Sequence, residues 1–114
     1  MINIDSRNNQ ISIIQGDTGV IDFVVDNYPL SEGDIVYFTV IDKDLPKGSE
    51  PVIKKKITEF NDGAAVINLL ALDTQELEVK KYFYDIQVNT KDGRVDTVIA
   101  PSKFVVMEGI SYEW

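Results

Sequence analysis

Any acid–base chemistry in this sequence would depend on carboxylates or lysines, because its 114 residues include no histidine and no cysteine. Those two absences remove the commonest general base, the thiolate nucleophiles, the preferred transition-metal ligands and every histidine-dependent triad. Glu76, Asp85 and Asp96 are carboxylates near the centre of the strand pattern, but the sequence singles out no pair among them. We therefore assign no catalytic residue and expect a protein without enzymatic activity or cofactor.

Two short acidic motifs have a chemical reading and a simpler structural one. Asp42 and Asp44 could supply oxygen ligands for calcium, but the remaining ligands and the glycine of an EF-hand loop are missing, so solvated loop acids are favoured. Residues 16–19 read Gly-Asp-Thr-Gly and contain the Asp-Thr-Gly string of aspartic proteases, in which two such carboxylates share a proton. A chain this short would need to dimerise for that chemistry, and the residues that follow do not fit. We expect a turn at residues 16–19 and no metal site.

The charge pattern bears on the kind of partner. The formal net charge of −8 repels phosphate backbones, so neither nucleic acid nor an anionic membrane is expected as a partner. Three consecutive lysines at residues 54–56 could bind an anion, but within a strand they are typical of a protected sheet edge. The N-terminal residues lack a signal-peptide pattern, and no apolar stretch approaches the roughly 20 residues that span a membrane. These features predict a chain that is made and kept in the cytoplasm without a signal peptide, or is exported by assembly into something larger.

The element that must position these side chains is the strand over residues 81–89, which has the clearest period-two pattern in the sequence. Residues 72–77 before it predict a helical turn with Asp73 as the cap, and the Asp92-Gly93 pair after it predicts a tight hairpin. One face of the strand carries Tyr82, Tyr84, Ile86 and Val88, and the other carries Phe83, Asp85, Gln87 and Asn89.

About seven strands at short spacing and one helical turn predict an all-β fold, an immunoglobulin-like antiparallel β-sandwich in a single domain over residues 1–114. Residues 1–9 are expected to form a short separate strand or an arm, and residues 108–114 a tail. The turn at residues 61–63 predicts that the strands over 52–58 and 64–70 form a hairpin. Pro101 indicates an edge strand or a strand that changes partner.

Two sets of residues follow from this arrangement. Asp73, Tyr82 and Tyr84 are predicted to form a structural corner, in which one tyrosine hydroxyl bonds back to the preceding backbone. The face opposite the core is predicted to carry an interface of Ile35, Tyr37, Ile41 and Phe83, because contiguous apolar surface with aromatic anchors usually marks a partner site. The alternative is that the tail over residues 110–114 folds back over these side chains.

Four segments of the chain carry a family resemblance. Residues 13–19, 57–65, 82–87 and 92–97 together resemble the small immunoglobulin-like modules of phages of Gram-positive bacteria, including the N-terminal domain of baseplate upper proteins. The similarity covers roughly residues 11–106. It implies a non-catalytic virion or prophage structural protein that docks other phage tail or baseplate subunits, is located in the virion and could form a homo-oligomer. The alternative function is a carbohydrate- or ligand-binding β-sandwich accessory domain, such as one found at a cell surface.

Overall fold

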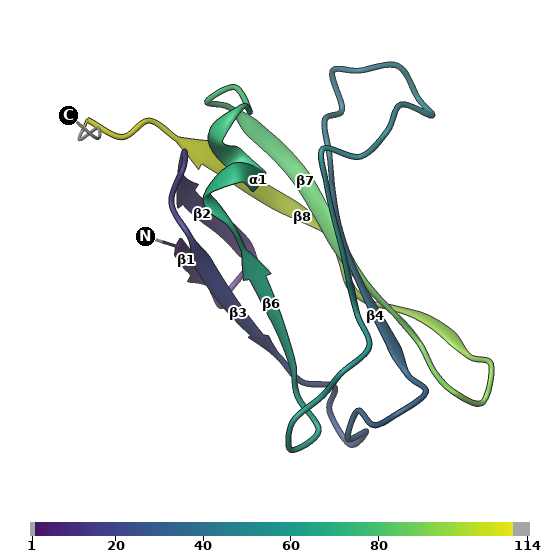
Figure 1. Cartoon of the computed structure of the whole chain (residues 1–114). Helices are drawn as coiled ribbons and strands as arrows, with labels where there is room; N and C mark the ends of the chain where they lie inside the picture. Colours follow the sequence, from purple (N-terminus) through teal and green to yellow (C-terminus); the bar gives the residue numbers. More distant parts are fainter. Residues whose placement is uncertain (1, 111–114) are drawn as a thin grey trace.

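The computed structural model describes residues 2–110 and arranges them as two facing β-sheets with one short helix (Figure 1). The all-β sandwich expected from the sequence is confirmed. The elements in chain order are β1 (Ile2–Asp5), β2 (Gln10–Ile14), β3 (Gly19–Phe23), β4 (Ile35–Ile41), β5 (Ile53–Ile57), β6 (Ala65–Leu69), α1 (Ala71–Gln75), β7 (Lys81–Asn89) and β8 (Val95–Met107).

The larger sheet has six strands in the order β1-β2-β8-β7-β4-β5, and the smaller sheet pairs β3 with β6. Figure 1 shows the smaller sheet lying across one face of the larger one, with α1 at one end of the sandwich. The prediction of a purely antiparallel fold is wrong at one pair, because β2 runs parallel to β8 with Ile11 opposite Phe104. These strands are far apart in the chain and no hairpin joins them, so nothing in the local sequence fixes their relative direction.

The predicted hairpin between the strands around residues 52–58 and 64–70 is also wrong. The turn does form, since Asn61 and Ala64 exchange backbone hydrogen bonds of 3.1 and 3.0 Å. Beyond that turn, β5 pairs with β4 in the larger sheet and β6 pairs with β3 in the smaller one. The physical reason is burial. Ala65, Ile67 and Leu69 are buried in the core when β6 lies in the smaller sheet, which faces the sheet that contains β4 and β5.

The core lies between the two sheets and is centred on three rings. Phe38 on β4, Tyr84 on β7 and Phe104 on β8 have centroid separations of 5.5 to 6.4 Å, within the range of favourable ring pairs. The apolar side chains around them are buried on one face of each strand, because successive strand residues point to opposite faces. The buried apolar set also includes Ile11, Ile13, Ile21, Phe23, Leu30, Val36, Val40, Ile53, Ala65, Ile67, Leu69, Tyr82, Ile86, Val88 and Val106.

The corner between α1 and β7 is fixed by a tyrosine and a carboxylate. Tyr82 is 2% exposed, and its hydroxyl donates a 2.9 Å hydrogen bond to the carbonyl oxygen of Glu78. The prediction that Asp73 caps the helix is wrong in position, because Leu70 is the N-cap and Asp73 is the third helical residue. The carboxylate of Asp73 reaches back to accept the Leu70 N–H at 2.7 Å, so the helix begins earlier than predicted.

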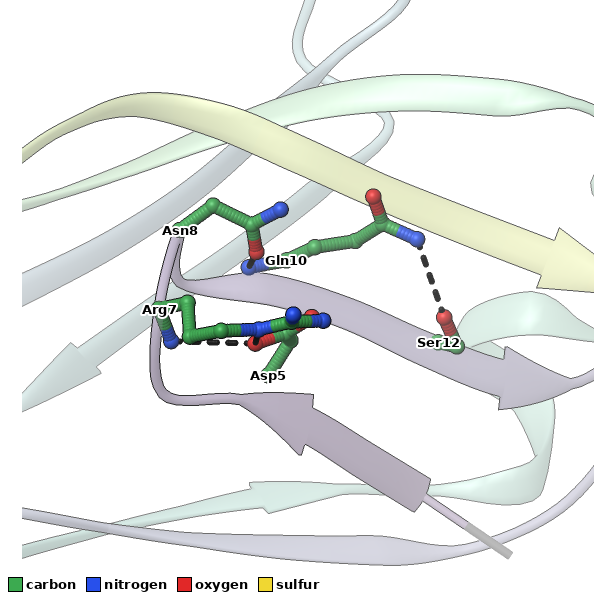
Figure 2. Close-up of polar contacts among 5 residues, drawn as sticks. All are labelled: Asp5, Arg7, Asn8, Gln10 and Ser12. Carbon is green, nitrogen blue, oxygen red and sulfur yellow. Dashed lines mark hydrogen bonds and ion pairs between the residues drawn. The ribbon is translucent and has the colours of Figure 1, made fainter.

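The N-terminal segment is a paired strand and not an arm. β1 pairs with β2 along its length, from Ile2 opposite Ile13 to Asp5 opposite Gln10. Figure 2 shows the turn between them, where the carboxylate of Asp5 accepts the Arg7 N–H at 2.9 Å and its guanidinium at 3.1 Å. The side-chain oxygen of Asn8 accepts the Gln10 N–H at 3.0 Å. These local bonds fix the turn that joins the edge strand β1 to β2.

Candidate functional site

The two loop acids considered as calcium ligands are bound by a lysine. The ammonium group of Lys80, just before β7, lies 2.7 Å from both the Asp42 and the Asp44 carboxylates. Its hydrogen bond lowers the pKa of Asp42, and the two carboxylates raise the pKa of Lys80. In residues 2–110 no cluster of three or more acidic side chains could hold a metal ion. The loop after β4 is thus pinned by Lys80 to the start of β7.

Residues 16–19 form a turn that packs against the helical corner. Gly16 has a φ of +83°, a conformation that favours glycine, and the Asp17 N–H donates to the carbonyl oxygen of Ile14 at 2.9 Å. The Gly16 N–H donates at 2.8 Å to the hydroxyl of Thr74, a buried residue of α1. The motif resembling a protease signature therefore ties the β2–β3 connection to α1.

The three lysines of residues 54–56 lie on β5, which forms an edge of the larger sheet. Lys54 pairs with Glu50 at 3.1 Å, and Lys55, on the opposite face of the strand, pairs with Asp73 at 2.7 Å. Because consecutive side chains alternate between faces, the three ammonium groups do not converge on one anion. Their arrangement is that of a charged edge strand.

The three central carboxylates do not meet. Glu76 is the C-cap of α1, at one end of the sandwich. Asp96 lies opposite Val88, whose side chain points to the core side of the sheet, whereas Asp85 is on the other face of β7. These three acids therefore do not form an acid–base pair with one another of the kind that hydrolases use.

The predicted interface residues all lie on the outer face of the larger sheet, but they form two groups. Ile41 and Phe83 are directly opposite each other on β4 and β7, and Ile41 is 40% exposed. At the other end of the same face, Tyr37 is opposite Gln87 and Ile35 is opposite Asn89. The row between the two groups pairs Thr39 with Asp85. The predicted continuous apolar patch is therefore divided by polar side chains.

The alternative prediction was that the tail over residues 110–114 covers this face. Of that tail, only Ile110 is among the described residues. The side chain of Ile110 is 92% exposed, so this part of the tail does not cover the sheet. Over Phe83 itself lie two lysines, with the ammonium groups of Lys43 and Lys81 at 4.0 and 5.6 Å from the ring centroid. Ile41, which is opposite Phe83, stays 40% exposed beside these cation–ring contacts.

Asp85 lies at the centre of the outer face, where the sheet is irregular. It has no partner on β8, because the β7–β8 register shifts between Tyr84 and Gln87. Two hollows, of about 110 and 350 Å³, flank this position and have Thr39 and Asp85 as common lining residues. The first is also lined by Ile41, Phe83 and Pro101. Burial raises the pKa of Asp85.

A buried carboxylate that the sequence pattern did not reveal is Asp34, immediately before β4. It is 1% exposed and accepts hydrogen bonds from the Tyr28 hydroxyl at 2.8 Å and from the N–H groups of Ser31 and Lys91 at 3.0 and 2.9 Å. Burial alone would raise its pKa, but these donors outweigh burial and lower it. The only sequence signal was an acid directly before a strand that is apolar on both faces.

A scan against protein-family models and a search of curated proteins find no match to the chain. Within residues 2–110, no helix is both long enough and apolar enough to cross a bilayer. Function is accordingly inferred from the site itself and from the resemblance to phage modules.

Proposed function

We propose that this chain is a non-catalytic phage or prophage structural protein whose β-sandwich docks other tail or baseplate subunits through the outer face of β4 and β7. The observation that carries the proposal is the pair Ile41 and Phe83, an aliphatic side chain and a ring in register on a solvent-facing sheet surface. Aromatic and aliphatic anchors within a polar surround are the usual centre of a protein interface. The resemblance to phage modules gives the class of partner.

The arrangement of charged groups supports a binding role over a catalytic one. Asp42 and Asp44 are bound by Lys80, and the buried Asp34 is surrounded by hydrogen-bond donors that hold it ionised. Each of these carboxylates stabilises a loop next to the sheet. A rigid scaffold with pinned loops suits a module that must present one face in a fixed geometry.

One observation favours the carbohydrate-binding alternative. The larger hollow on the outer face is lined by Tyr37, Thr39, Asp85, Gln87 and Asn89, which offer a ring and several polar groups to sugar hydroxyls. A glycan array probed with labelled protein tests this function. Binding to one class of glycan that is lost in Tyr37→Ala, but kept in Phe83→Ala, would favour this alternative.

The docking proposal is tested by inducing phage particles from the source strain and measuring the chain in purified particles by peptide mass spectrometry. We expect the chain to co-purify at a fixed ratio to the tail proteins. An Ile41→Thr, Phe83→Thr variant, checked for folding by circular dichroism, should be depleted from particles. The matched control, Val66→Thr with Leu72→Thr, changes two exposed apolar residues of β6 and α1 and should be incorporated normally. Absence of the unmodified chain from particles would contradict the proposal.

A further inference from the structure

Asp85 is a partly buried carboxylate without a cationic partner in residues 2–110. Its pKa is raised by burial alone, and no described residue donates a hydrogen bond to it or forms an ion pair with it. Thr39 lies directly opposite it on β4. On its other side β8 contributes Pro101, which has no backbone N–H to offer. A carboxylate that loses water without gaining a partner is destabilising, so this position favours binding of a cation.

Two lysines of this face make contacts with groups other than Asp85. Lys43 lies over the Phe83 ring at 4.0 Å, and Lys54, which is opposite Thr39, pairs with Glu50 at 3.1 Å. The extra residues of the irregular register lie on β8, opposite Asp85, and leave Asp85 without a paired residue on that strand. The hollows on either side of it leave room for a side chain supplied from outside.

The walls of the two hollows indicate which cation fits. Ile41, Phe83 and Pro101 offer an apolar surface to an aliphatic stem, and the ring of Tyr37 lines the second hollow. A guanidinium group is planar, stacks on rings and binds a carboxylate through two parallel hydrogen bonds, whereas an ammonium group is a more strongly hydrated point charge. The arrangement thus favours arginine over lysine or a bare metal ion.

We propose that the outer face of β4 and β7 docks an arginine-bearing segment of a protein partner, with the guanidinium on the Asp85 carboxylate and its stem against Ile41 and Phe83. This inference rests on the proposed docking function and specifies the chemistry of the partner. Asp85 is the one carboxylate that β4, β5 and β7 present on this face, so the attraction for a basic group is local to it.

The first test uses a defined probe, the peptide acetyl-Ala-Arg-Ala-amide, titrated into the tens of millimolar range at constant ionic strength and followed by amide NMR. We expect shifts confined to Thr39, Phe83, Asp85 and Gln87. A citrulline peptide of the same shape but without charge should cause none. Asp85→Asn should abolish the shifts, and the matched change Asp96→Asn, at an exposed acid on the other face, should retain them. Absence of shifts, or shifts that persist in Asp85→Asn, would overturn the proposal.

The second test separates this inference from the docking function on which it rests. In the particle assay, Asp85→Asn should be incorporated several-fold less than Asp96→Asn, although both remain folded. If Asp85→Asn is incorporated fully while the Ile41→Thr, Phe83→Thr variant is lost, the face docks a partner but not through arginine. If both variants are incorporated like the unmodified chain, the docking face is itself wrong.

Discussion

The backbone N–H of Lys91 donates a 2.9 Å hydrogen bond to the carboxylate of Asp34, a residue 57 positions earlier in the chain. This bond joins the loop before β4 to the turn between β7 and β8, at one end of the sandwich. The ammonium group of the same lysine also contacts the Ser31 hydroxyl. The two central strands of the proposed docking face are therefore held in place at this end by one buried acid.

Removing this acid should lower stability substantially. Asp34→Ala removes the acceptor of the Tyr28 hydroxyl and of the Ser31 and Lys91 N–H groups, each hydrogen bond to the carboxylate contributing about 1–3 kcal/mol. We expect a loss of roughly 2–5 kcal/mol in the free energy of unfolding, measured by urea denaturation. The matched control is Asp22→Ala on β3, an exposed acid, which should change stability by less than about 0.5 kcal/mol. Equal effects of the two changes would contradict this role.

Asp34 should also make stability depend on pH in the acid range. Its pKa is lowered in the folded state from an ordinary value of 3.8, so the unfolded chain takes up the proton first. The stability that the ionised group confers is fully present above that value and is lost as the pH falls through the folded-state pKa. Urea midpoints measured between pH 7 and pH 2 should fall less steeply at the acid end for Asp34→Asn. Parallel curves for the two proteins would be evidence against this linkage.

Asp85 should make stability depend on pH in the opposite direction to Asp34. Burial raises its pKa in the folded state above 3.8, so its ionised form opposes folding once the pH exceeds the folded-state pKa. Asp85→Asn should therefore be more stable than the unmodified protein at pH 7, and this difference should vanish near pH 3. The matched change Gln87→Asn, two residues along the same face, should give no such pH-dependent gain. A loss of stability at pH 7 in Asp85→Asn would mean that the carboxylate already has a partner.

Two substitutions of Tyr82 should distinguish the contribution of its ring to stability from that of its hydroxyl. Tyr82→Ala removes a buried ring and should cost about 3–5 kcal/mol, whereas Tyr82→Phe removes only the bond to Glu78 and should cost about 1 kcal/mol. Phe83→Ala, on the outer face of the same strand, should cost less than Tyr82→Ala. Chemical denaturation of the three variants checks this order, and an equal cost for Tyr82→Ala and Phe83→Ala would contradict it.

The sequence predicts the fold well where the signal is local. Alternation along residues 81–89 identified Tyr82 and Tyr84 as inward and Phe83 and Asp85 as outward, because the two faces of a strand follow directly from period two. The edge position of β5 was predicted from its three consecutive lysines, which are typical of a protected sheet edge. Pro101 marked the region where β8 changes: β2 pairs with β8 only from Phe104 onward.

What the sequence did not predict depends on partners far along the chain. Asp73 has the spacing of an N-cap, but β6 ends at Leu69 and the helix begins directly after it, with Leu70 as the N-cap and Asp73 as the third helical residue. The Lys80 contact with Asp42 spans 38 residues, and the Asp34 bond spans 57. The division of the outer face by Asp85 required the register between β4 and β7, which no period-two pattern specifies.

The measurement that tests the docking face most directly is lysine labelling with an amine-reactive reagent, comparing the free chain with purified phage particles. Lys43 and Lys81 lie over Phe83, while Lys91 is exposed at the far end of β7. We expect Lys43 and Lys81 to be labelled in the free chain and strongly protected in particles, with Lys91 labelled equally in both. Equal labelling of Lys43 and Lys81 in the two states would contradict docking through the outer face of β4 and β7.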